Sequence, residues 1–214
     1  MKERPILFSA PMVRALLAGR KGQTRRVAGL EIINADPDRY RYLGVVSGPG
    51  EPHYAFHDEQ TGAQTLVRCR TSAPGDRLWV RESWAPDPPD VDGWGYAAWA
   101  GCREGQIAGV PERFRHPAYC VYAADWLHGS IRWTPSIHMP RWASRITLEI
   151  TGVRVERLNE ISRGDAMAEG CPFPNMAVGD DPRAWFRDLW VEINGAGSWD
   201  TNPWVWAIEF RRLP

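Results

Sequence analysis

The chain has 214 residues, which suits one domain, or one domain with insertions, and is too short for two full-sized domains. Its 26 basic and 26 acidic residues cancel, which excludes a histone-like polycation and an acidic tail. No apolar run is long enough for a transmembrane helix, and the first residues lack the apolar core of a secretory signal. We therefore expect a cytoplasmic protein with no membrane partner.

Two features of the composition stand out: the chain has 12 Trp, and nearly all of its basic residues are Arg, with Lys only at Lys2 and Lys21. A GC-rich coding sequence is the simplest cause of the Arg excess, although Arg also suits the recognition of phosphates and bases. Residues 1–30 contain seven basic residues and one acidic residue, a local charge of +6. This end of the chain is therefore the first candidate for an anionic partner.

The first predicted elements are a short strand, a helix and a basic turn. Residues 5–8 form an apolar run, and a helix with an apolar stripe follows, with Ser9 as its cap. Gly19 is expected to end this helix. The basic run at residues 20–26 comes next, so a turn beside the helix is expected to carry four cations, Arg20, Lys21, Arg25 and Arg26.

Two segments, residues 31–72 and 86–118, are rich in Gly, Pro and polar residues and are predicted to be insertions, the first with a loose hairpin. Between them, residues 76–84 alternate as a strand does. The apolar face of that strand carries Leu78, Val80 and also Glu82. Because side chains alternate across a strand, the Glu82 carboxylate is expected on the inward side, near the strand end.

The second half predicts a further strand at 119–124, a long strand at 145–158, helices beginning at Ser162 and near Asp181, and a last strand at 204–211. The apolar alternation of the long strand shifts after residues 151–152, which suggests a bulge or bend. The longer helix has an apolar face of Phe186, Leu189, Trp190 and Ile193.

Together the elements predict an α+β fold, namely a small mixed β-barrel of about five to seven strands with peripheral helices and loop insertions. We expect residues 1–214 to form a single domain.

The four cysteines do not occur as C-x-x-C pairs and are most simply reduced thiols, so no metal and no cofactor is expected. A zinc site made of Cys102, His116 and Cys120, with Cys69 as the fourth ligand, is the alternative. Its spacing does not match a recognised zinc finger.

Three stretches occur in order along the chain: Gly19-x-Lys21-x-x-Thr24-x-Arg26, residues 74–82 (PGDRLWVRE), and residues 158–170 (LNEISRGDAMAEG). Together they resemble the ASCH domain family of the PUA-like superfamily. Residues 133–145 and 194–206 also resemble the larger ASCH proteins of tailed bacteriophages and prophages. The resemblance implies a PUA-like barrel with a cleft suited to RNA or a nucleoside.

Some small members of this family are amidohydrolases that remove the acyl group of N4-acetylcytidine with a Lys, a Thr and a Glu. The resemblance assigns these roles to Lys21, Thr24 and, through the second stretch, Glu82. The chemistry is coherent: in a helical turn Lys21 would face Thr24 and, if neutral, could take its proton. Neighbouring cations and burial would lower the pKa of Lys21, and an apolar setting would raise the pKa of Glu82 so that it acts as an acid.

A second group of residues is predicted to bind the ligand. Arg20, Arg25 and Arg26 are candidates for contacts with phosphate or a base edge, and a solvated basic face is the alternative. The Pro-bounded loop at residues 132–145 adds candidates for stacking and charge, namely Trp133, His138, Arg141 and Trp142. The alternatives are that its Trp residues cover the barrel as core, and that Glu82 pairs with an Arg such as Arg26.

Four functions are compatible with these residues. The first is hydrolysis of an amide on an acylated pyrimidine nucleoside such as N4-acetylcytidine. The others are a non-catalytic module that binds RNA or modified nucleic acid, a metal-independent ribonuclease, and a phage assembly protein. Zero net charge disfavours long duplexes, so a nucleoside or single-stranded RNA is the expected partner.

Overall fold

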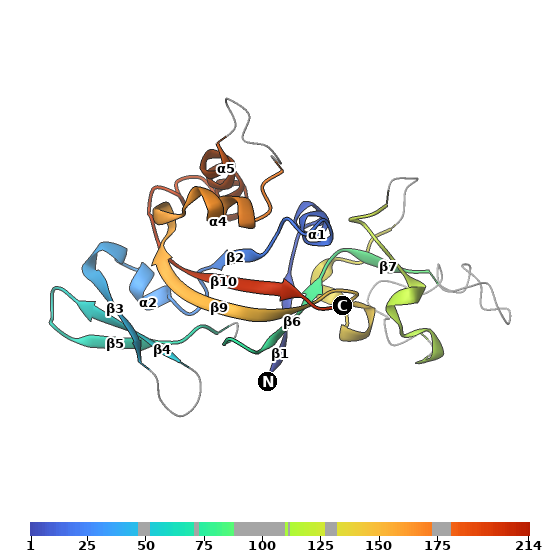
Figure 1. Cartoon of the computed structure of the whole chain (residues 1–214), viewed down its shortest axis with the longest axis horizontal. Coiled ribbons are helices and arrows are strands. Elements are labelled where there is room, and N and C mark those ends of the chain that lie inside the picture. Colours follow the sequence, from blue (N-terminus) through green and yellow to red (C-terminus); the bar gives the residue numbers. More distant parts are fainter. Residues whose placement is uncertain (47–51, 71–72, 88–109, 111, 127–131, 173–180) are drawn as a thin grey trace.

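The computed structural model describes residues 1–46, 52–70, 73–87, 110, 112–126, 132–172 and 181–214. This described part is a mixed α+β structure, as predicted, with strands in sheets of five, three and two and four α-helices beside them (Figure 1). None of these helices is long and apolar enough to cross a membrane.

The largest sheet has the strand order β1-β6-β9-β10-β2, in which β1 runs parallel to β6 and the other neighbours are antiparallel. Its strands are β1 (Glu3–Leu7), β6 (Arg77–Arg81), β9 (Thr147–Arg157), β10 (Trp204–Arg212) and β2 (Gln23–Arg26). The register of β9 against β10 shifts beside Thr151, which confirms the predicted bulge and accompanies the strong curvature of both strands in Figure 1.

The five-stranded sheet curls but does not close. In the described part, β1 and β2 are its two edges and share no hydrogen-bonded ladder, so the closed barrel that we expected is not formed. At this seam the Arg26 side chain donates from Nη2 to the carbonyl oxygen of Leu7, at 3.2 Å, in place of strand pairing. The seam matters because the candidate site lies beside it.

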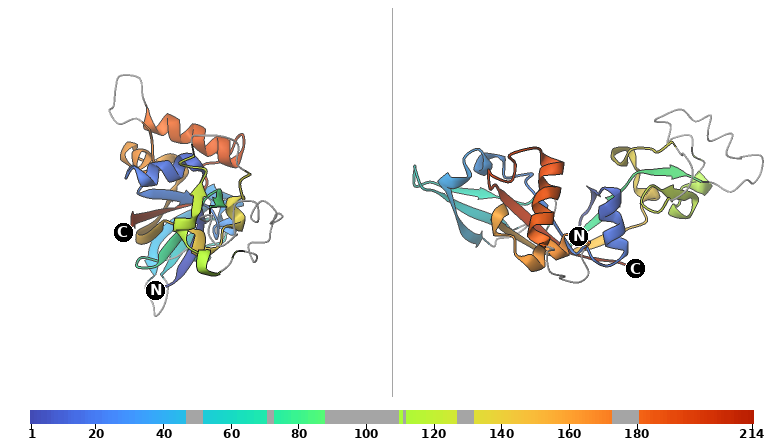
Figure 2. Two further views of the ribbon diagram at one scale, coloured as in Figure 1. Left: turned by 90° about the vertical axis from the view of Figure 1, so that its right-hand side faces the viewer. Right: turned by 90° about the horizontal axis from the view of Figure 1, so that it is seen from above.

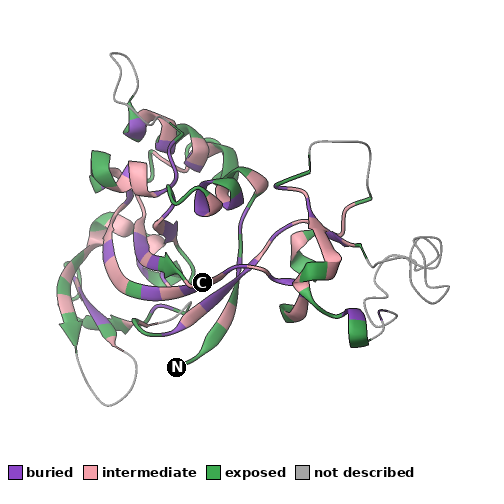
Figure 3. Cartoon of the chain, turned by 45° about the vertical axis from the view of Figure 1, so that its right-hand side comes forward, coloured by how far each residue is buried: buried purple, intermediate pink, exposed green. Residues whose placement is uncertain are grey.

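Helix α1 (Ala10–Leu17) begins after Ser9 and ends before Gly19, as the apolar stripe predicted. Gly19 has a left-handed φ of 69°, which suits a glycine at the end of a helix. Val13 and Leu16 face the main core, which lies inside the curled sheet (Figure 3).

Residues 31–72 are more ordered than the predicted loose hairpin. They contain α2 (Glu31–Asn34) and an antiparallel sheet of β3 (Tyr40–Val46), β4 (His53–Asp58) and β5 (Gln64–Val67). Tyr54 and Phe56 on β4 are buried and contact Trp206 and Trp204 edge-on. This segment therefore completes the main core.

Two further strands, β7 (Trp84–Pro86) and β8 (Cys120–Tyr122), form a small sheet at the opposite end of the molecule from β3–β5 (Figures 1 and 2). Most of the predicted insertion at 86–118 lies outside the described residues. Trp84 and Tyr122 pack with Met139 and Ala143 in a separate apolar cluster.

Helices α4 (Arg163–Ala168) and α5 (Pro182–Asn194) lie on one side of the large sheet, above β2 and β10 in Figure 1. Both begin where the sequence predicts, because Ser162 and Asp181 accept hydrogen bonds from backbone N–H groups of the first turn. Phe186 and Trp190 of α5 pack with Leu158 and Val205. Helix α5 forms one wall of the cleft described next.

Candidate functional site

Lys21 is buried just before β2, where it forms an isolated bridge with Glu169, the residue after α4. The Lys21 side chain is 0% exposed, and its Nζ donates to Glu169 Oε2 at 2.8 Å and to the Glu169 carbonyl oxygen at 2.8 Å. The same Nζ lies 5.4 Å from the ring centre of Phe8. The single lysine of the basic run is thus paired inside the protein.

Burial lowers the pKa of Lys21, as predicted, although Glu169 opposes this effect. The neighbouring Arg26 and Arg25 lower it further and are smaller causes than burial. The neutral amine is therefore easier to form here than in water.

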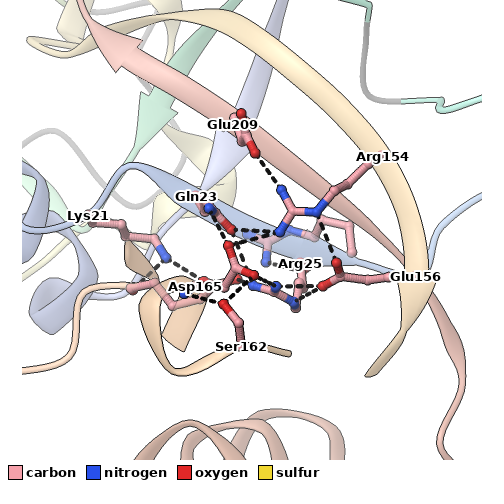
Figure 4. A network of polar contacts seen from close by, with 10 residues as sticks. Lys21, Gln23, Arg25, Arg154, Glu156, Ser162, Asp165 and Glu209 are labelled. Atoms are coloured by element: carbon pink, nitrogen blue, oxygen red, sulfur yellow. Dashed lines mark hydrogen bonds and ion pairs between the residues drawn. The ribbon is translucent and has the colours of Figure 1, made fainter. Parts of the chain in front are cut away.

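A polar network connects β2 with α4 and β9 (Figure 4), and Glu169 joins Lys21 to it. Its Oε1 accepts from Arg25 Nη1 at 3.0 Å, while its Oε2 accepts from Lys21. Arg25 is also held by Glu156, through Nε at 2.9 Å. The network continues through Gln23, Arg154, Asp165, Ser162 and Glu209. Both carboxylate oxygens of Glu169 are therefore held by cations.

Thr24 lies in the middle of β2, opposite Ile208, and is 1% exposed. The expected helical turn that would bring Lys21 and Thr24 face to face is wrong, because residues 23–26 form a strand paired with β10. Thr24 nevertheless lines the same cleft as Glu169.

The predicted group of Lys21, Thr24 and Glu82 is not brought together. Glu82 is buried, as the alternation predicted, but its two oxygens accept from Arg145 Nε at 2.9 Å and Nη2 at 3.0 Å. Burial raises the pKa of Glu82, and the Arg145 pair opposes this. Glu82 does not line the cleft. The carboxylate beside Lys21 is Glu169, which belongs to the third stretch of the ASCH-like pattern.

A cleft of about 480 Å³ lies between β2, the end of β1 and helix α5. Its polar lining includes Thr24, Arg26 and Glu169. Helix α5 contributes the apolar face that the sequence predicted. The aromatic and aliphatic side chains of the cleft are Leu7, Phe8, Met12, Val27, Phe186, Leu189, Trp190 and Ile193.

The three predicted arginines have different surroundings. Arg20 donates to the carbonyl oxygens of Gly170 and Cys171, each at 3.1 Å, and does not line the cleft. Arg25 lines the cleft but is engaged by carboxylates. Arg26 lines it as well, and its hydrogen bonds to the described residues go to the backbone oxygens of Arg25 and Leu7.

The loop at residues 132–145 reaches the cleft through Ser136, but the side chains that we predicted to contact the ligand lie outside it. Trp142 packs edge-on against Trp84, with ring centres 5.4 Å apart, and Arg141 pairs with Glu3. Trp133 contacts Trp126, and His138 is exposed. Of these predicted residues, Trp133, His138, Arg141 and Trp142, none lines the cleft. The aromatic side chains at the cleft are instead Phe8, Phe186 and Trp190.

The zinc alternative gains no support from the described residues, in which no group of three His, Cys, Asp or Glu side chains is arranged to hold a metal ion. Cys69 is buried in the main core, and the Cys120 thiol donates to the His116 carbonyl oxygen. His116 Nδ1 accepts from the Ala118 N–H at 3.1 Å. Cys102 lies outside the described residues.

Comparisons of the chain with protein-family models, with curated proteins and with solved structures gave no match. Membership of the ASCH family and a function on nucleosides or RNA therefore stay predictions.

Proposed function

We propose that this protein is an ASCH-type, PUA-like member that binds a modified cytidine in the cleft between β2 and α5 and hydrolyses its N-acyl amide. The observation that carries this proposal is the buried Lys21–Glu169 pair beside a cleft that Thr24 lines. Glu169 replaces Glu82 as the proposed carboxylate of the site.

The cleft has the features that a nucleoside requires. Its volume of about 480 Å³ lies in the usual range for small-molecule sites. Leu189 and Ile193 of α5 offer apolar surface to a flat base beside the buried rings of Phe186 and Trp190, and Thr24 and Arg26 add polar groups to the lining. A planar heterocycle with polar edges fits this mixture of apolar and polar lining residues better than a wholly apolar or wholly polar ligand does.

The proposed reaction uses the Thr24 hydroxyl as nucleophile. Neutral Lys21 takes the hydroxyl proton while Thr24 Oγ1 attacks the acyl carbon, and the proton then passes to the amine as the C–N bond breaks. Water hydrolyses the resulting Thr24 ester and releases the carboxylic acid. Glu169 orients Lys21 through its 2.8 Å hydrogen bond, and burial favours the neutral amine that the first step requires.

A second candidate is a non-catalytic module that binds RNA or a modified nucleoside. The complete burial of the Lys21 side chain favours it, because a base must reach the proton that it removes. Both candidates place the ligand in the same cleft. Only the first predicts that the ligand is hydrolysed.

The test is deacylation of N4-acetylcytidine by the wild type and by Lys21→Met, Thr24→Val and Glu169→Gln. We expect each variant to lose about 100-fold or more in kcat. Glu149→Gln is the matched control, because it also changes a carboxylate that pairs with an Arg, and Glu149 does not line the cleft. Wild-type binding without turnover would favour the second candidate, and full activity of Thr24→Val would exclude Thr24 as nucleophile.

A further inference from the structure

Arg26 is a cation at the cleft whose protein partners carry no negative charge. Its Nη1 donates to the Arg25 carbonyl oxygen at 3.0 Å and its Nη2 to the Leu7 carbonyl oxygen at 3.2 Å. The guanidinium carbon lies 5.6 Å from the ring centre of Phe8. Among the described residues, no carboxylate forms an ion pair with Arg26.

The next residue along the strand shows the contrast. Arg25 forms ion pairs with Glu156, Asp165 and Glu169, whereas the partly buried Arg26 forms none. Buried or partly buried charges are normally compensated, because removal from water is costly. Burial lowers the pKa of Arg26, and the nearby charge of Glu169 opposes this effect without forming an ion pair.

The described lining of the cleft supplies Arg26 with a nearby negative charge but with no ion pair. Glu169 is the one carboxylate among the lining residues, and Lys21 and Arg25 occupy both of its oxygens. The remaining polar lining near the end of β1 includes neutral hydroxyl groups, those of Ser9, Ser83 and Ser136. A guanidinium beside hydroxyl groups is a suitable setting for a phosphate.

We infer that Arg26 binds the phosphate group of a nucleoside monophosphate, so that the ligand of the cleft is a nucleotide and not a free nucleoside. A guanidinium has five N–H donors, and the two contacts with backbone carbonyls leave donors for phosphate oxygens. This inference rests on the proposed function, because it assumes that the base occupies the same cleft.

The test compares the affinities of cytidine and cytidine 5′-monophosphate by calorimetry. We expect the wild type to bind the monophosphate about tenfold more tightly, which is the effect of one or two charge-assisted hydrogen bonds. In Arg26→Gln the ratio of the two affinities should fall to about one. Arg20→Gln is the matched control, because it removes the same charge from a nearby position outside the cleft and should keep the ratio.

The outcomes separate this inference from the proposed function. Equal wild-type affinities would overturn the inference and leave the proposed function standing, whereas binding of neither ligand would overturn both. An equal loss of preference in Arg20→Gln would also overturn it, because a general positive field would then explain the result. If Arg26→Gln does not fold, the wild type is measured at rising salt concentration. Added salt should then weaken the binding of cytidine 5′-monophosphate and leave the binding of cytidine unchanged.

Discussion

At the scale of single residues, two buried tryptophans differ in the partner of the indole N–H. Trp206 Nε1 donates to the Ala28 carbonyl oxygen at 3.0 Å. Trp190 Nε1 is buried at the cleft wall, and the described residues offer it no hydrogen-bond partner. A buried polar group contributes to stability only when it is paired.

We therefore expect Trp206→Phe to lower the free energy of unfolding by about 1 kcal/mol more than Trp190→Phe does, because only the former loses an indole hydrogen bond. Urea unfolding of both variants measures the difference. Equal losses would mean that ring volume alone accounts for both substitutions.

The two glutamates show what a single sequence can and cannot predict at this scale. Alternation along one strand is a local pattern, and it correctly predicted the burial of Glu82. The partner of Glu82, Arg145, is 63 positions away, and the partner of Lys21, Glu169, is 148 positions away. Spacing carries no information about such pairs, so the sequence singled out Lys21 and did not single out Glu169 beside it.

At the scale of elements, the corner between β4 and β5 depends on the buried Asp58. Arg39 donates from Nε to Asp58 Oδ1 at 2.8 Å, and the backbone N–H groups of Gln60 and Thr61 donate to the same oxygen. The Arg39 hydrogen bond holds the pKa of Asp58 well below its ordinary value of 3.8.

Because the pKa is lowered in the folded state, the stabilisation by ionised Asp58 is fully present above pH 3.8 and is lost as the pH falls below it. We expect Asp58→Asn to melt at a lower temperature than the wild type at pH 5–7, and this difference to shrink below pH 3.8. Thermal melts from pH 7 to pH 3 measure this difference in melting temperature. Asp188→Asn is the control, because Asp188 is an exposed carboxylate of α5. A difference that stays constant with pH would contradict this account.

The elements that were predicted well are those with their own periodicity, such as α1, α5 and β9. Strand β2 was missed because Gln23–Arg26 has no apolar alternation and becomes a strand only through its pairing with β10. Strand β4 was missed because Tyr54 and Phe56 lie in a segment whose composition resembles a loop. In both cases tertiary contacts decide the structure.

At the scale of the whole molecule, the Glu82–Arg145 pair joins the large sheet to the β7–β8 unit. Arg145 also pairs with Asp125, and its guanidinium lies 3.9 Å from the ring centre of Tyr122 on β8. The Glu82 side chain is 1% exposed and that of Arg145 is 21% exposed. This pair is therefore a link between two parts of the fold.

We expect Glu82→Gln to lower the free energy of unfolding by about 2 kcal/mol, because Arg145 is left partly buried without its main counter-ion. Deacylation of N4-acetylcytidine should remain within about twofold of wild type, in contrast to Glu169→Gln. Thermal melting and kcat measured on the same preparations test this. If Glu82→Gln loses turnover and keeps its stability, Glu82 acts in catalysis and this account of it is wrong.

The overall class, mixed α and β, followed from the sequence, whereas the open seam did not. Alternation predicts which residues face inward, and it does so equally for a closed barrel and for a curled open sheet. The seam depends on whether β1 and β2 exchange hydrogen bonds, and here the Arg26 side chain bridges them instead.

The pairing of β2 also has a consequence for how the protein is made. In the described part, this strand pairs only with β10, from which nearly the whole chain separates it. Closing so long a loop is entropically costly and slow, so β2 joins the sheet late in folding. A nascent chain on the ribosome has already made Lys21 and Thr24 but has no cleft until β10 has been synthesised.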